Sequence, residues 1–149
     1  MRPGKRLRPY LAYQTAIVCG ASRERALHLA VAMELFHDFA LVHDDLLDHS
    51  DERRGRPTLH KVFTSEHRRH DWLGDSAASG EALALLAGDL SFAWADASLR
   101  KAMTPSNAER LFSAWNAMRE EVILGQATDV ALALERRLPS KHKLLDMLS

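Results

Sequence analysis

The feature that most constrains the fold of this chain is how rarely its helix-forming segments are interrupted. Glycine occurs 7 times and proline 5 times in 149 residues, and long stretches contain neither. Alanine (22) and leucine (23) dominate, and both favour helices. The alternation of polar and apolar residues that indicates a strand is nearly absent. The sequence therefore predicts an all-α fold.

Start and stop signals place the helices. We expect helices over residues 9–18, 22–48, 58–69, 81–103 and 105–137, with polar loops over 50–57 and 71–80. Ser22 is the expected N-cap of the second helix, and Thr104 followed by Pro105 marks the start of the fifth. A further helix starts at Ser140 and has just begun where the sequence stops. We therefore expect residues 1–149 to be one partial domain, cut at both ends.

Composition excludes several classes of protein. Twenty basic and twenty acidic side chains give a net charge of zero, which argues against a nucleic-acid binder. No apolar run reaches the roughly 18 residues of a membrane-spanning helix. The N-terminus lacks the apolar stretch of a secretory signal, and the single cysteine, Cys19, cannot form an internal disulfide. These features predict a cytoplasmic protein without a membrane span.

The chemistry concentrates at the end of the second helix, where Asp44, Asp45 and Asp48 occur together. Asp44 and Asp48 are four residues apart, so their carboxylates lie on one face of a helix, one turn apart. Like charges so placed, in the last turn where the helix dipole disfavours anions, destabilise a helix unless a cation joins them. Hard oxygen ligands favour Mg²⁺. A metal site and a solvated acidic helix end both explain this pattern.

Arginines follow these carboxylates at once. Arg53 and Arg54 come five residues after Asp48, and guanidinium groups are well suited to phosphate oxygens. Together the two groups are typical of a site for a diphosphate with Mg²⁺. Lys5 and Arg8, three residues apart at a helix entry, offer a second anion site, although a frayed basic terminus is the simpler interpretation of that pair.

Four motifs in order, Gly-Lys-Arg-Leu-Arg-Pro, Asp-Asp-Leu-Leu-Asp, Arg-Arg-Gly-Arg-Pro-Thr and Gly-Gln-Ala-Thr-Asp, resemble those of the trans-type polyprenyl diphosphate synthases. That family includes the farnesyl and geranylgeranyl diphosphate synthases. The resemblance implies the N-terminal part of an all-helical isoprenoid synthase bundle. It also implies a prenyltransferase that joins isopentenyl diphosphate to an allylic diphosphate, with Mg²⁺ as cofactor and a homodimer or a heteromeric synthase as the assembly.

The resemblance assigns roles residue by residue. The isopentenyl diphosphate positions are Lys5, Arg8, His37 and Arg54. Asp44 and Asp48 match the metal-binding carboxylates, and Arg53 matches the arginine that grips the allylic diphosphate. These last three are the catalytic candidates. Gln126 and Asp129 match a later motif that faces the same cavity, and Asp45 belongs to the aspartate motif without a clear metal contact.

Two residues before the aspartates bear on product length. Ala40 lies one turn before Asp44 on the same face, and Phe39 is its neighbour about 100° around the helix. Alanine leaves space for a growing apolar tail and phenylalanine forms a wall, a pattern that resembles short-chain synthases. We expect a C15–C20 product, with C20 favoured. A plain core role for Phe39 is the alternative.

Two further groups are weaker signals. Gly88-Asp89 resembles a family signature, to which we assign only packing. His60, His67, His70 and Asp71 are irregularly spaced, which favours a solvated segment over a metal site.

The sequence also departs from the family, since the family's lysine-threonine pair and second aspartate-rich motif do not occur in it. We therefore expect the isolated chain to make no prenyl product. The alternatives are a non-catalytic binding or regulatory subunit, or an inactive fragment of a synthase. A metal-dependent phosphohydrolase, suggested by the two His-Asp pairs, leaves the arginines unexplained.

Overall fold

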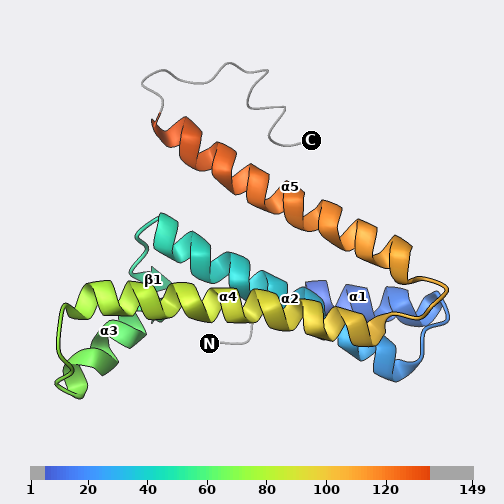
Figure 1. Ribbon diagram of the computed structural model, residues 1–149, viewed down its shortest axis with the longest axis horizontal. Coiled ribbons are helices and arrows are strands. Elements are labelled where there is room, and N and C mark those ends of the chain that lie inside the picture. Colours follow the sequence, from blue (N-terminus) through green and yellow to red (C-terminus); the bar gives the residue numbers. More distant parts are fainter. Residues whose placement is uncertain (1–5, 135–149) are drawn as a thin grey trace. The chain divides into compact units, whose positions relative to one another are not determined.

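A computed structural model describes residues 6–134 of the chain (Figure 1). Five helices and one very short hairpin account for them. Their bounds are α1 Leu7–Val18, α2 Arg23–Leu47, β1 Glu52–Arg53, β2 Arg56–Pro57, α3 Leu59–Arg69, α4 Ser76–Ala102 and α5 Ala108–Leu134. The chain divides into two compact units, one up to Met103 and one from Thr104 onward. The all-α prediction is confirmed.

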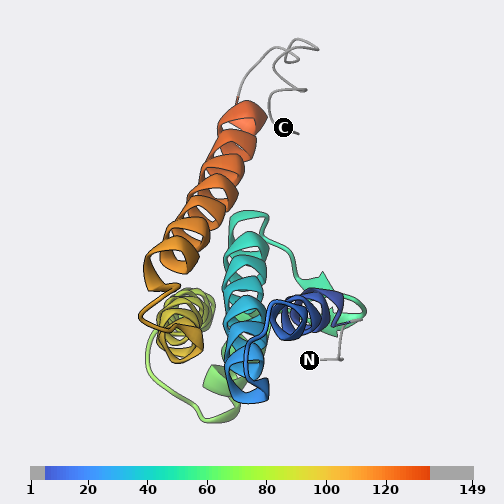
Figure 2. The same cartoon turned by 90° about the vertical axis from the view of Figure 1, so that its right-hand side faces the viewer.

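Helix α2 is the centre of the first unit. It lies between α1 and α4, and Figure 2 shows these two nearly end-on on either side of it, while α3 packs against α4. Beside Phe36, Val42 and Leu99, many of the buried side chains of these two helices are small: Ala26, Ala30 and Ala32 on α2, and Ala84 and Ala95 on α4. Small residues let the helix backbones approach closely, which explains why an alanine-rich chain can form a tight helical layer.

Two serines of α4 attach it to the backbone of α2. The Ser91 hydroxyl donates to the Leu35 carbonyl at 3.0 Å, and the Ser98 hydroxyl donates to the His28 carbonyl at 2.8 Å. Because both bonds are at least partly buried, they fix the axial register of the two helices. That register sets which residues of α4 lie against the C-terminal end of α2.

The start of α4 differs from the prediction. Residues 71–80 were expected to form a loop, but α4 already begins at Ser76. Asp75 is its N-cap and accepts from the Ala77 and Ala78 amides at 2.7 and 3.0 Å. These backbone bonds, that from Ala78 first, lower the pKa of Asp75. Gly80 suggests a break in sequence, yet its role is packing, because a Cβ there would lie 2.6 Å from the His60 carbonyl oxygen.

The start of α5 also differs. Thr104 and Pro105 were expected to cap and begin this helix, but residues 105–107 form a turn and α5 begins at Ala108. The Asn107 side-chain carbonyl accepts from the Thr104 amide at 2.7 Å, which closes the turn. The expected end of this helix near residue 137, and the helix from Ser140, lie outside the described residues.

The segment between α2 and α3 was expected to be only a polar loop, and it contains an antiparallel hairpin. Glu52 pairs with Pro57 and Arg53 with Arg56. Its two central residues, Arg54 and Gly55, have φ of 55° and 72°. Positive φ at both positions is the signature of a type I′ turn, where asparagine and glycine are preferred. An arginine at the first position is therefore held in a conformation that its side chain disfavours.

Within residues 6–134, α2 and α4 are long and apolar enough to cross a membrane by length and composition alone. Their most apolar windows have mean hydropathies of 1.2 and 1.3. Core helices of soluble proteins pass the same test, so this is weak evidence. Neither helix contains an unbroken apolar run of about 18 residues, so the sequence pattern did not indicate them, and the absence of a membrane span stays a prediction.

Candidate functional site: carboxylates and arginines at the end of α2

The aspartates at the end of α2 are bound by Arg53 from the hairpin. Arg53 Nε donates to Asp45 Oδ1 at 2.6 Å, and Arg53 Nη2 donates to Asp44 Oδ2 at 2.5 Å. Burial alone would lower the pKa of Arg53, but the bonds to Asp45 and Asp44 outweigh it and raise that pKa. One guanidinium therefore bridges two adjacent carboxylates, and it comes from β1, which follows α2 after a short turn at residues 48–49.

The three aspartates differ in their surroundings. The Asp45 side chain is 9% exposed, whereas that of Asp44 is 30% exposed. Asp48 is exposed and caps the helix, with φ −84° and ψ −2°. Asp44 and Asp48 thus lie one turn apart with access to solvent, as predicted.

The donor set fits a hard divalent cation that shares its ligands with a phosphate. Among the residues that the structure describes, no group of three or more His, Cys, Asp or Glu side chains could hold a metal ion. Two carboxylates one turn apart match the way Mg²⁺ binds, through one or two carboxylates, water and substrate phosphates.

A second cluster lies beside this one and contains three of the four residues that the resemblance assigns to isopentenyl diphosphate. Arg8 Nη1 on α1 donates to His37 Nε2 on α2 at 3.4 Å. Burial lowers the pKa of His37 most, and the positive charges of Arg8, Arg54 and Arg53 lower it further, against an opposing effect of Asp38. Arg8, His37 and the hairpin arginines thus share one electrostatic environment. Lys5 lies outside the described residues.

The proposed chain-length residues face an aromatic cluster. The Phe39 ring contacts Phe36, His43 and Phe92, with centroid separations of 5.6, 4.5 and 4.8 Å. Ala40 beside it is half-buried. Phe39 is therefore held by neighbours on α2 and α4, which suits both a wall and a core residue, so the role of Phe39 and Ala40 in product length stays a prediction.

Packing behind this cluster explains Gly88. A Cβ on Gly88 would lie 2.4 Å from the His43 ring, so only glycine leaves room for it. His43 Nε2 lies 3.3 Å from the Leu85 carbonyl oxygen and 3.5 Å from Asp89 Oδ1. The structure thus supports the packing role expected of Gly88, and gives Asp89 a contact with the histidine that precedes Asp44.

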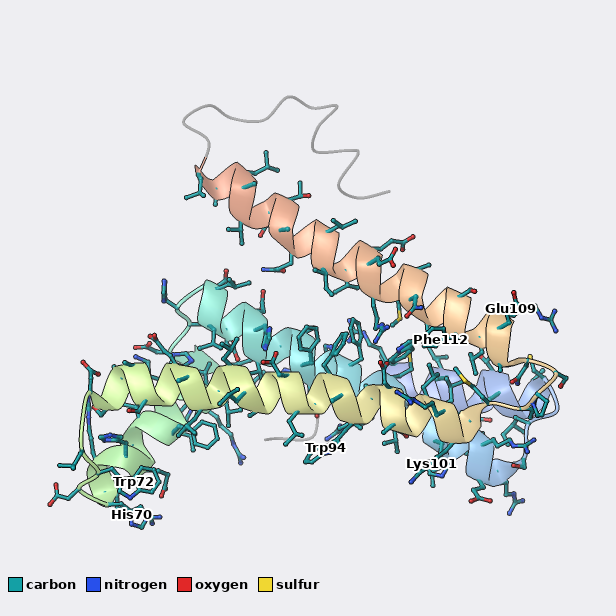
Figure 3. The ribbon with its side chains drawn as sticks, in the orientation of Figure 1. His70, Trp72, Trp94, Lys101, Glu109 and Phe112 are labelled. Atoms are coloured by element: carbon teal, nitrogen blue, oxygen red, sulfur yellow. The ribbon has the colours of Figure 1, made fainter. Side chains whose placement is uncertain are left out.

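The histidines after the hairpin do not form the solvated segment that their spacing suggested. His60 and His67 are buried. Thr58, buried and directly before α3, lies 3.2 Å from His60 Nδ1 and donates its hydroxyl to the Ser50 carbonyl at 2.7 Å, which ties the hairpin to α3. Only His70 fits the expectation: it is exposed and stacks on Trp72 (Figure 3), with centroids 5.3 Å apart.

A cavity of about 350 Å³ lies beside the Asp45–Arg53 pair. Its apolar lining comes from α2, α3 and the end of the hairpin, and its polar lining from the hairpin arginines together with Asp45 and Thr58. The Arg53 side chain therefore has open space next to it. The sequence pattern predicts neither this cavity nor the contact of Asp45 with Arg53. Both depend on how the hairpin lies against α2.

Gln126 and Asp129 lie three residues apart on α5, Gln126 half-buried and Asp129 exposed. Helix α5 belongs to the second unit, which is described by itself. That these two residues face the same cavity as the aspartates stays a prediction.

Comparison with known proteins identifies the family. The family model described as polyprenyl synthetase matches residues 1–149. The chain belongs to the polyprenyl synthetase family. It is 35% identical over 145 residues to the short chain isoprenyl diphosphate synthase of Methanocaldococcus jannaschii, covering 97% of this chain and 39% of that protein. It is 39% identical over 128 residues to the (2E,6E)-farnesyl diphosphate synthase of Mycobacterium tuberculosis, covering 86% of this chain and 31% of that one.

Solved structures of this family share the fold. The geranylgeranyl pyrophosphate synthase of Corynebacterium glutamicum, solved with isoprenyl diphosphate and magnesium, superposes with a TM-score of 0.79 and 36% identity. That match covers 88% of this chain and 39% of the synthase chain. The chain therefore spans about two fifths of the length of such relatives, and its helices are those of an isoprenoid synthase.

Proposed function

We propose that the protein that carries these residues is a prenyltransferase. It condenses isopentenyl diphosphate with an allylic diphosphate and makes a short-chain prenyl diphosphate of C15 to C20, with C20 favoured. The single observation that carries this proposal is the pairing of Arg53 with Asp44 and Asp45 next to the Arg8–His37–Arg54 cluster. Two cationic groups flanking a pair of carboxylates suit two diphosphates and a divalent cation.

Each group has a place in the reaction. Asp44 and Asp48 would hold Mg²⁺, which would supply charge neutralisation for the departing diphosphate. Arg53 stabilises the same leaving group, while Arg8, His37 and Arg54 orient isopentenyl diphosphate. The allylic carbon–oxygen bond breaks, the double bond of isopentenyl diphosphate forms the new carbon–carbon bond, and a proton is lost. Pyrophosphate leaves with the electron pair of the broken bond.

The lowered pKa of His37 has a consequence for this role. Its ordinary value is 6.5, so a lower pKa keeps the ring neutral near neutral pH. A neutral ring whose Nε2 accepts from Arg8 can donate through Nδ1. His37 thus acts as an orienting hydrogen-bond group, and the arginines supply the positive charge.

An apolar stripe on α4 supports the proposed assembly as a homodimer or a heteromeric synthase. Leu86, Leu90 and Trp94 are four residues apart in turn and 62%, 47% and 55% exposed. Figure 3 shows Trp94 projecting from α4. A stripe of this kind is typical of a subunit contact. Cytoplasmic localisation is part of the same proposal and rests on composition alone.

The test is a condensation assay with the complete product of the gene. Radiolabelled isopentenyl diphosphate, Mg²⁺ and dimethylallyl, geranyl or farnesyl diphosphate should give a labelled C15 or C20 product. The 149-residue chain assayed alone should give none, because its relatives are more than twice its length. A complete gene product that binds both diphosphates and never forms product would favour the regulatory subunit instead.

A further inference from the structure

Asp45 and Asp44 are adjacent in sequence but hold Arg53 in different ways. The bond from Arg53 Nε to Asp45 is enclosed, since the Asp45 side chain is only 9% exposed. The bond from Nη2 to Asp44 is accessible, with 30% of the Asp44 side chain exposed. A charge-assisted bond to a buried carboxylate is costly to break, because breaking it leaves a buried charge unpaired. The Asp45 contact is therefore the firmer of the two.

Arg53 also has room to move. It lines the cavity of about 350 Å³ beside the pair, and its own side chain is 35% exposed. Because the guanidinium is a rigid plane, Nε and Nη2 move together, but a tilt of this plane about Nε carries Nη2 away from Asp44 while Nε stays within reach of Asp45. Nη2 can thus leave Asp44 without loss of the buried bond.

A divalent cation at Asp44 would compete with Arg53. Both carry positive charge, and both take the same carboxylate, so bringing them together without a further anion is unfavourable. A bound diphosphate removes this repulsion. Its oxygens accept hydrogen bonds from a guanidinium just as carboxylate oxygens do, so Arg53 can leave Asp44 to the cation.

We propose that Asp45 is a positioning residue that anchors Arg53, and that Arg53 exchanges the Asp44 carboxylate for a bound diphosphate, so that cation and diphosphate bind together. This rests on the proposed function, and it gives the middle aspartate a role separate from metal binding. Asp44, which Arg53 binds in this structure, is the carboxylate that the cation would bind instead.

The first experiment measures the exchange by calorimetry, on the full chain, with Mn²⁺ alone and with Mn²⁺ plus inorganic pyrophosphate. Arg53→Gln should raise the affinity for Mn²⁺ alone by about tenfold, the effect of removing a competing unit charge. It should also abolish most of the mutual enhancement between Mn²⁺ and pyrophosphate. Arg56→Gln is the matched control, because Arg56 is exposed and pairs with Arg53 across the same hairpin. An equal gain in both variants would reduce the effect to net charge and overturn the exchange.

The second experiment separates positioning from metal ligation. Asp45→Asn keeps an oxygen that can accept from Arg53 Nε, so Mn²⁺ affinity and enhancement should stay within about threefold of the wild type. Asp44→Asn should lose Mn²⁺ binding. Circular dichroism checks that both variants stay folded. Loss of Mn²⁺ binding in a folded Asp45→Asn variant to the same extent as in Asp44→Asn would make Asp45 a ligand and overturn its positioning role.

The two levels of the proposal fail differently. Wild-type protein that shows no binding of pyrophosphate with Mn²⁺ contradicts the proposed function itself. Wild-type protein that binds both, with Arg53→Gln indistinguishable from Arg56→Gln, contradicts only the exchange.

Discussion

Helix α2 has two segments of opposite character, an aromatic one around Phe36 and Phe39 and, at its end, a charged one at Asp44–Asp48. The aromatic segment is held by rings from α2 and α4, with Phe92 4.8 Å from Phe39. In the charged segment, Arg53 on β1 binds Asp44 and Asp45. Packed rings resist displacement, whereas ion pairs at a partly exposed site can change partners. One helix thus combines a closely packed aromatic segment with ion pairs that can change partners.

The largest expected effect falls on the charged segment. In the complete gene product, Asp44→Ala should lower the condensation rate by about 10²–10³, the loss typical of one preorganised electrostatic group. Steady-state assay of kcat and KM with Mg²⁺ measures it. A rate within about threefold of the wild type would mean that the carboxylate pair is not the metal site.

The aromatic segment should respond in the product and not in the rate. Phe39→Ala removes the ring beside Ala40, so products should lengthen by one or more five-carbon units while turnover changes little. Chromatography of the dephosphorylated products measures the length. An unchanged product distribution would make Phe39 a core residue, as its contacts with Phe36 and Phe92 also allow.

The packing behind the two segments gives a smaller effect, on stability. Gly88→Ala places a methyl group 2.4 Å from the His43 ring and should cost about 1–3 kcal/mol of unfolding free energy through overpacking. Denaturant unfolding measures this cost. In a His43→Ala background the same substitution should cost much less, because the clash is gone. Equal costs in both backgrounds would contradict the close contact.

The smallest effect concerns pH. The pKa of His37 is below its ordinary 6.5, so the unfolded chain binds this proton more readily than the folded chain. Stability should therefore fall as pH drops through 6.5 toward the lowered value, and level off below it. Urea unfolding at about pH 5.5 and 7.5 should show a smaller difference for His37→Gln than for the wild type. Identical differences would place the effect on other groups.

Much of this arrangement could be predicted from the sequence. Helical periodicity and the Ser22 cap gave α2 its bounds within a residue, and the Ser22 hydroxyl does accept from the Arg25 amide at 3.3 Å. Spacing alone placed Asp44 and Asp48 on one face. The motif resemblance grouped Arg8, His37 and Arg54, and in the structure Arg8 binds His37 while the charge of Arg54 acts on the same ring.

The rest depended on contacts between distant residues. Glycine as a residue type suggests a loop at position 80. In the structure Gly80 instead allows α4 to lie close to α3, and the neighbouring sequence does not indicate this contact between helices. The contact of Asp45 with Arg53 depends on the hairpin, whose turn has arginine where asparagine is the usual signal, so the pattern predicted a polar loop and not a hairpin. Pro105 is a signal for a helix start, but the Asn107 side chain accepts from the Thr104 amide and residues 105–107 form a turn before α5 begins.

The backbone of Arg54 bears on how this family can be engineered. Its φ of 55° is one that asparagine or glycine adopts more easily, by about 1 kcal/mol. A screen that selects only for thermal tolerance would therefore enrich these residues at position 54 and remove the guanidinium at the same time. Selection for ligand binding would act in the opposite direction. If arginine persisted at position 54 under both selections, the gain in ligand binding from its guanidinium would exceed the conformational cost of its positive φ.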